Sequence, residues 1–152
     1  MIGRLYSVAI GSQAQTTAKY LIEVASAADS ITMIERAWIS QTSFDTSENL
    51  GTKIQDIATS GTGTATTPRP LQEGDAAFGG VVETNCTIPP TEGTPVWVEQ
   101  GFNVLSGFLW TPANDDEVIV VSPSQLAGMN LDVAPSGSMD FSYGMTLREI
   151  GG

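Results

Sequence analysis

The apolar residues near the carboxyl end of the chain recur at every second position. From residue 139 to residue 147, large apolar side chains alternate with small or polar ones: Met139, Phe141, Tyr143, Met145 and Leu147. Successive side chains of a β-strand point to opposite faces, so this period predicts a strand with one buried face, which helical spacing cannot produce. A similar alternation covers residues 129–133. The turn-forming residues 134–137 separate the two runs, which predicts a β-hairpin.

The same reading predicts strands along most of the chain. Alternating or apolar runs occupy residues 6–10, 20–24, 31–41, 81–87, 96–104 and 108–110. Residues 11–13 are predicted to connect the first two of these strands. The continuous apolar run at residues 118–121 predicts a short strand that is covered on both faces.

Residues 45–58 give a mixed signal. Leu50, Ile54 and Ile57 have helical spacing, and the segment opens with residues suited to a helix cap. A glycine in its middle weakens a helix. The sequence therefore predicts a short helical turn followed by a strand from Thr52.

Residues 59–80 form the one long stretch without a clear period. The stretch is rich in Gly, Thr and Pro, and Leu71 and Phe78 are its only large apolar residues. Loops of this length are uncommon in compact domains and are usually functional or mobile. We therefore expect a long irregular loop at residues 59–80.

Together these segments predict an all-β chain. About eight to ten short strands, with turn signals about every 8–12 residues and almost no helix, are typical of a sandwich or barrel. The strand number and the chain length of 152 residues favour a jelly-roll-like antiparallel β-sandwich. We expect a single domain over residues 1–152, with no internal repeat.

The charge balance narrows the set of partners. Six basic residues stand against 17 acidic ones, which gives a net charge of −11. Such a surface repels nucleic-acid phosphates and anionic lipids, so neither nucleic acid nor a membrane is expected as a partner. No apolar run approaches the length of a membrane span. The acidity is typical of a surface that favours solubility, and a docking surface for a basic partner is the alternative.

The absence of histidine removes most catalytic chemistry. Without histidine, a Ser-His-Asp triad, a Cys-His pair and the common zinc sites cannot form. Cys86 is the only cysteine, so we expect a buried free thiol and maturation in a reducing cytoplasm. No pair of carboxylates stands out as a glycosidase pair. The chain is therefore expected to be no enzyme and to hold no cofactor or metal.

Two further features have a structural and a functional interpretation. The acidic cluster at residues 115–117 is interpreted as a solvated turn, with a calcium site as the alternative. Trp38, Trp97 and Trp110 are interpreted as packing residues, and an exposed platform for a ligand is the alternative. Trp97 alternates with two valines, so it is expected to be exposed or buried between subunits.

Several short motifs resemble small virion proteins of tailed phages and prophages over nearly the whole chain. The similar segments are Arg4 to Ile10, Glu35-Arg36, Ile39 to Gln41, Thr67 to Leu71, Gly74-Asp75, Phe102-Asn103, Gly107, Trp110, Pro112 and Glu149 to Gly151. The resemblance implies a capsid decoration (cement) protein, which binds the outside of a phage head and stabilises the lattice of the major capsid protein. It also implies a homotrimer, synthesis in the cytoplasm of a bacterial host, and a place on the capsid exterior.

The contact with the capsid is expected in the 59–80 loop. Arg69 lies there between two prolines, and we predict Arg69, Leu71 and Phe78 as the contact residues. The alternative for Leu71 and Phe78 is that they pin the loop to their own subunit. Two other functions stay open at this point: a tail-fibre or lectin-like host-recognition module, and a glycan hydrolase.

Overall fold

The computed structural model describes residues 3–43 and 46–151. These residues form twelve β-strands and one short 3-10 helix, and no α-helix occurs among them. The strands are β1 (Arg4–Gln15), β2 (Lys19–Ala25), β3 (Ser30–Gln41), β4 (Asn49–Thr59), β5 (Thr62–Ala65), β6 (Arg69–Pro70), β7 (Val81–Ile88), β8 (Thr91–Asn103), β9 (Phe108–Trp110), β10 (Ile119–Val121), β11 (Leu126–Leu131) and β12 (Met139–Gly151). The 3-10 helix η1 (Asp115–Glu117) lies between β9 and β10. The predicted all-β class is confirmed.

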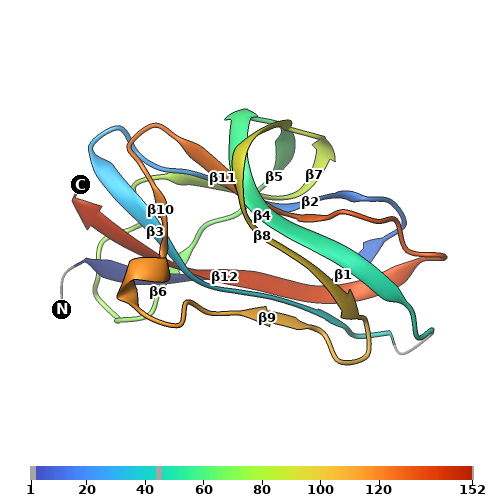
Figure 1. The fold of residues 1–152 in the computed structure, drawn as a ribbon. Helices are drawn as coiled ribbons and strands as arrows, with labels where there is room; N and C mark the ends of the chain where they lie inside the picture. The colour runs from blue at the N-terminus through green and yellow to red at the C-terminus, as the bar shows by residue number, and fades with distance from the viewer. Residues whose placement is uncertain (1–2, 44–45, 152) are drawn as a thin grey trace.

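The strands form two antiparallel sheets that pack as a sandwich (Figure 1). Sheet A has the order β10-β3-β12-β1-β6, and β9 also pairs with β3; sheet B has the order β5-β7-β2-β11-β4-β8. β9 and β10 pair with different parts of β3 and act as one interrupted strand. If β5, β6 and β7 are left out and β9 and β10 are counted as one strand, eight strands remain. When these eight are numbered 1 to 8 along the chain, their order is 1-8-3-6 in sheet A and 2-7-4-5 in sheet B.

This order is that of a jelly roll, in which two Greek keys distribute eight strands over two sheets. The predicted jelly-roll-like sandwich is therefore confirmed, with somewhat more strands than the eight to ten expected. Of the strands left out of this order, β5 and β6 are short and lie at the edges of the two sheets, whereas β7 has eight residues and lies between β5 and β2.

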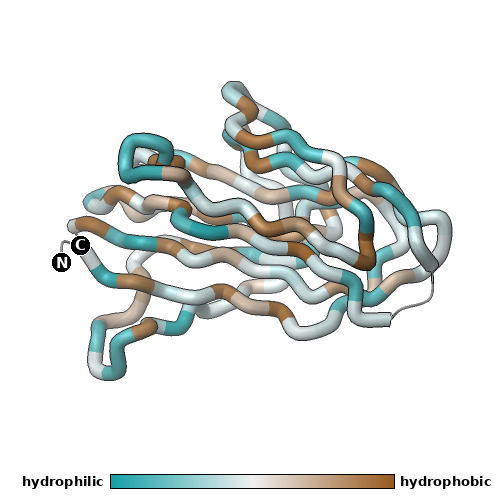
Figure 2. The backbone as a smooth tube through the Cα atoms, turned by 60° about the horizontal axis from the view of Figure 1, so that its bottom comes forward, coloured by the Kyte–Doolittle hydropathy of each residue, from teal (hydrophilic) through white to brown (hydrophobic). Residues whose placement is uncertain are grey.

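The core is arranged around β12, the middle strand of sheet A. Its alternating apolar residues are all buried: Met139, Phe141, Tyr143, Met145 and Leu147. The register with β1 places Tyr6 opposite Leu147 and Val8 opposite Met145, so apolar rows cross the sheet. Figure 2 shows the resulting alternation of apolar and polar positions along the strands. The strongest sequence signal thus marks the centre of the core.

The helical turn predicted within residues 45–58 is wrong for the described part of that segment. β4 begins at Asn49, and its side chains are buried on both faces. Leu50 and Ile54 belong to the core between the sheets, whereas Ile57 packs with Tyr20 in a separate cluster. A strand that contributes to two clusters produces apolar spacings of four and three residues, which imitate a helix. The proposed cap at Asp45 lies outside the described residues.

Three smaller expectations are also corrected. The hairpin predicted from residues 129–133 and 139–147 does not form, because β11 pairs within sheet B and β12 within sheet A. Residues 11–13, predicted as a connection, belong to β1, which continues past a register shift between Ile10 and Gln13. The strand at residues 118–121 is covered on one face only. Ile119 and Val121 are buried there, while Val120 is 45% exposed because β10 lies at the edge of sheet A.

The centre of sheet A contains a close approach between a glycine and a tryptophan. Gly144 of β12 lies opposite Trp38 of β3. A methyl group at Gly144 would collide with the indole of Trp38 and with the backbone oxygen of Val8. Glycine at this position leaves the space that the indole of Trp38 occupies.

We predict that Gly144→Ala destabilises the protein. Because the added methyl group must displace the indole or the backbone, the free energy of unfolding should fall by about 1–3 kcal/mol. Denaturant unfolding measures the change. Gly11→Ala is the matched control, because no atom lies within 4 Å of its added methyl group. Equal stability of the two variants would contradict the predicted collision.

Candidate functional site

Residues 59–80, called the edge segment below, run along one side of the sandwich and join its two sheets (Figure 1, green to yellow-green). Within the segment, β5 pairs with β7 of sheet B and β6 pairs with β1 of sheet A. The segment is therefore less irregular than predicted, because two short strands fix it to the sandwich. These strands contain glycine, threonine and proline, and their pairing depends on backbone hydrogen bonds rather than on apolar side chains.

A buried carboxylate holds the beginning of the edge segment. Glu23 of β2 is only 3% exposed. Its carboxylate accepts a hydrogen bond from the backbone N–H of Gly61 at 3.0 Å and another from the hydroxyl of Ser60. A buried charge is unfavourable unless it is hydrogen-bonded, so the position of the segment and the burial of Glu23 depend on each other.

A second buried carboxylate holds the end of the edge segment. Glu149 of β12 is 2% exposed. It accepts hydrogen bonds from the backbone N–H of Gly79 at 2.9 Å and from the hydroxyl of Ser30 at 3.3 Å. The hydroxyl of Tyr6 lies 3.3 Å from the other carboxylate oxygen and 2.9 Å from the backbone oxygen of Ala76. Sheet A thus fixes the segment at its end as sheet B does at its beginning.

The three predicted contact residues lie in different environments. Phe78 is 8% exposed and packs edge-on against the ring of Tyr6, with 5.2 Å between the ring centroids. It therefore belongs to the core of its own subunit. Arg69 and Leu71, by contrast, are exposed, Leu71 by 56%. The backbone N–H of Leu71 donates to the oxygen of Leu5 at 2.8 Å, which fixes the chain beneath these two side chains.

Arg69 lies between two shallow depressions of the surface. One of them, about 470 Å³ in volume, lies between β1 and the residues that precede β6. The other, about 400 Å³, is lined by residues 67–70, Asp75 and Ala77. Arg69 forms no ion pair with any described residue. Its guanidinium therefore presents all of its donors to an external acceptor.

A third depression, which we call the tryptophan groove, lies at the opposite edge of the sandwich. It is about 510 Å³ in volume. Its lining comes from β8, β9, η1 and β10: Trp97, Val98, Trp110, Asp116, Glu117, Val118, Ile119 and Val120. In sheet B, β8 and β5 are the two outer strands, and in sheet A, β10 and β6 are the two outer strands. The groove therefore lies at the β8 and β10 edge of the sandwich, and Arg69 lies at the opposite edge, beside β5 and β6.

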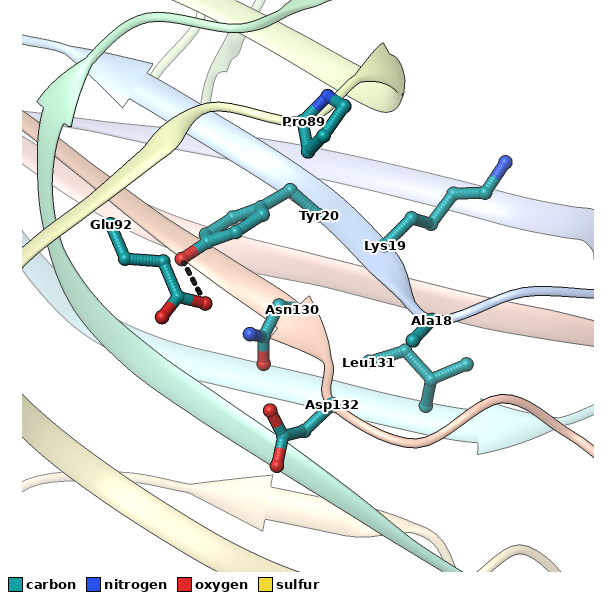
Figure 3. A pocket seen from close by; sticks show the side chains of 8 residues that line it. All are labelled: Ala18, Lys19, Tyr20, Pro89, Glu92, Asn130, Leu131 and Asp132. Atoms are coloured by element: carbon teal, nitrogen blue, oxygen red, sulfur yellow. Dashed lines mark hydrogen bonds between the residues drawn. The ribbon is translucent and has the colours of Figure 1, made fainter.

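A small pocket of about 160 Å³ lies near the beginning of β2 (Figure 3). The ring of Tyr20 crosses it, and its hydroxyl accepts from Gln55 Nε2 at 2.5 Å and donates to Glu92 at 3.4 Å. Burial, reinforced by the charge of Glu92, strongly raises the pKa of Tyr20. Asp132 on the pocket wall pairs with Lys53 at 2.9 Å. The polar groups of this pocket already have partners, which is typical of a structural network rather than of a binding site.

The remaining reactive groups are held in unreactive states or apart from one another. Cys86 is buried, and desolvation together with the charges of Glu23 and Glu83 raises the pKa of its thiol to about 11. A thiol with this pKa stays protonated at neutral pH and is a poor nucleophile. No group of three or more His, Cys, Asp or Glu residues in the described part of the chain is placed to hold a metal ion. Within residues 3–43 and 46–151, no helix is long and apolar enough to cross a membrane.

Comparisons of the chain with protein-family models, with curated proteins and with solved structures found no match. A jelly roll supports many unrelated functions, so the fold alone does not assign one. The function must therefore be inferred from the exposed residues of the edge segment and from the tryptophan groove.

Sequence reasoning missed the two carboxylates that hold the edge segment, although both left a signal. Glu149 continues the inward-facing series of β12, two positions after Leu147, so the alternation itself placed a carboxylate in the core. Glu23 stands between Ile22 and Val24 in a run of buried residues. A charged residue in an apolar face indicates a hydrogen-bonded structural or functional role.

We predict that Glu149→Ala loosens the edge segment. Removal of the Glu149 carboxylate leaves the N–H of Gly79 and the hydroxyl of Ser30 without their acceptor. The free energy of unfolding should therefore fall by about 3 kcal/mol. Limited proteolysis should also cleave within residues 70–80 faster than in the native chain. Glu73→Ala, in the same segment but exposed, is the control and should change neither property. A native cleavage pattern in Glu149→Ala would contradict the role given to this carboxylate.

Proposed function

We propose that this chain is a capsid decoration protein, which binds the outside of a tailed-phage head and stabilises the lattice of the major capsid protein. One observation carries the proposal: a fixed edge segment presents a cation and an apolar side chain, Arg69 and Leu71, side by side on an otherwise acidic surface. The sequence resemblance to small virion proteins points to the same function.

The way in which the edge segment is held supports a role in binding. Ordering a mobile loop on contact costs about 1–2 kcal/mol per residue in backbone entropy. The hydrogen bonds to Glu23 and Glu149, and the burial of Phe78, already hold the segment before any partner arrives. A preorganised surface loses less affinity to ordering. Phe78 thus supports the contact from within, and Arg69 and Leu71 make it.

Arginine suits a specific protein contact. Its planar guanidinium can form two parallel hydrogen bonds to one carboxylate, which fixes orientation as well as adding affinity. The partner surface is accordingly expected to offer a carboxylate beside an apolar patch. The high net negative charge of the rest of the chain would repel an acidic surface in most other orientations, so an exposed cation at the contact favours one orientation.

Assembly on a shell strengthens a modest contact. We propose a homotrimer with cyclic symmetry, because three identical contacts made together give avidity that one contact lacks. A protein that binds only the assembled lattice stabilises it by mass action. A tail-fibre or lectin-like module is the alternative. The copy number per virion separates the two, since hundreds of copies mean a shell component and a few dozen mean a tail component.

We predict that the double variant Arg69→Ser and Leu71→Ser binds undecorated capsids at least tenfold more weakly. The loss of one charge-assisted hydrogen bond and one buried apolar side chain exceeds the 1.4 kcal/mol that corresponds to tenfold. Co-sedimentation with capsids measures occupancy. The double variant Arg36→Ser and Leu109→Ser removes the same side chains from exposed positions elsewhere and should bind normally. Unchanged occupancy of the folded Arg69 and Leu71 variant would show that the contact lies elsewhere.

We also predict that the purified chain sediments at three times its monomer mass. Sedimentation equilibrium over a range of concentrations measures this mass directly, since association depends on protomer concentration. A monomer mass at concentrations well above micromolar would contradict the trimer in solution.

A further inference from the structure

The tryptophan groove has the dimensions and the composition of a ligand site. Its volume of about 510 Å³ lies in the range of roughly 300–1,000 Å³ that is typical of such sites. Two tryptophans and a row of apolar β10 residues line it, and two carboxylates of η1 stand at its side.

A β-bulge places Trp97 in the groove. Ile54 of β4 pairs with Val98 of β8, and the next residue of β4, Gln55, pairs with Val96. Trp97 therefore has no partner in the ladder. Bulges of this kind redirect a side chain and bend an edge strand. Trp97 is partly buried and packs against the core, so its orientation is fixed while part of its surface stays accessible.

Trp110 joins Trp97 from the other sheet. It ends β9, the short edge strand beside β3, and it is also partly buried against the core. The two indoles thus come from the edge strands of opposite sheets and meet at the opening between them. Neither indole side chain makes a hydrogen bond, an ion pair or a ring contact with any described residue. Both N–H donors are therefore without an acceptor among the described residues.

The carboxylates beside the indoles supply acceptors. Asp116 and Glu117 are exposed. Glu117 is fixed by hydrogen bonds from the backbone N–H of Ala113 at 3.3 Å and from Asn114 Nδ2 at 3.0 Å. The carboxylate of Asp116 accepts no hydrogen bond from a described residue. The groove thus combines unpaired donors, unpaired acceptors and apolar ring surface.

These three properties select the class of ligand. A lysine or arginine side chain has donors only and cannot accept from the indole N–H groups. An anionic ligand is repelled by η1 and by the net charge of −11. An uncharged sugar has hydroxyl groups that both donate and accept, and C–H faces that pack on an indole. We propose that the tryptophan groove binds an uncharged saccharide, with the hydroxyl groups donating to Asp116 and Glu117 and accepting from Trp97 and Trp110.

The proposed saccharide site is independent of the capsid contact. The groove lies at the β8 and β10 edge, whereas Arg69 and Leu71 lie at the β5 and β6 edge. Residues can therefore be changed at one edge without a direct effect on the other. The saccharide site does not rest on the proposed decoration function, and either proposal can fail alone.

The test is binding of the full chain to an array of neutral glycans, followed by tryptophan-fluorescence titration with cellohexaose, maltohexaose, chitohexaose and laminarihexaose. We expect saturable binding of at least one of these sugars. Trp97→Ala and Trp110→Ala should each weaken it at least tenfold, while Trp38→Ala, which removes a tryptophan outside the groove, should leave it unchanged. Asp116→Asn should weaken binding by a smaller factor.

A second set of variants keeps the test decisive if an alanine variant does not fold. Trp97→Phe and Trp110→Phe retain an aromatic ring and remove only the N–H donor, so each should fold and still weaken binding several-fold. Absence of binding to every neutral glycan would overturn the proposal. The same holds for binding that survives the changes at Trp97 and Trp110, and for binding of a lysine-rich peptide in place of any sugar.

Discussion

Two buried carboxylates determine how the edge segment lies on the jelly roll. Glu23 and Glu149 come from different sheets, and each accepts backbone N–H donors from one end of the segment. A carboxylate without such donors is unfavourable in the interior, because its desolvation is not compensated. The segment therefore satisfies the two charges, and the two charges fix the segment. The exposed position of Arg69 and Leu71, and the burial of Phe78, follow from this arrangement.

The edge strands on the two sides of the sandwich are protected from pairing with other chains in different ways. An unprotected edge strand can pair with another chain and aggregate. On one side, the edge segment adds β5 and β6 as short terminal strands. On the other side, β9 and β10 are three residues each, β8 is interrupted by register shifts, and η1 places acidic side chains nearby. This second side needs no covering segment, so its side chains stay available to a ligand.

The sequence predicted those parts of the fold in which one face is buried and one is solvated. The alternation of apolar and polar residues predicted the strands β11 and β12. The total number of predicted strands, together with the lack of predicted helix, indicated a jelly roll. Within the described part of residues 45–58, the predicted helical turn was wrong, because Leu50 and Ile57 enter different clusters and imitate helical spacing, whereas the strand predicted from Thr52 is confirmed. It also missed β5 and β6, because their pairing comes from the backbone and leaves no apolar pattern.

The candidate sites were predictable to different degrees for equally physical reasons. Arg69 was predicted as a contact residue because a cation between two prolines in an acidic chain is conspicuous in the sequence. Phe78 was assigned to the same surface, but its burial depends on Tyr6, which is distant in the chain and close only after folding. The tryptophan groove could not be assembled from the sequence at all. Trp97 lines the groove beside a register shift in β8. Trp110 comes from the other sheet, and the two tryptophans line the same groove only after the sheets have packed together.

Placing two contacts at opposite edges has a consequence for binding strength. If the edge segment seats the chain on a shell, as proposed, then the tryptophan groove lies on the side away from Arg69 and Leu71. A shallow groove that binds a single sugar weakly is a poor receptor by itself. Repeated at every decorated position of a shell, the same groove would engage a polysaccharide at many points. Each further engagement is then effectively intramolecular, so the overall affinity rises by orders of magnitude without any new contact. If both proposals hold, a weak site at one edge and a preorganised site at the other would complement each other, because only the capsid contact would have to hold a single copy in place.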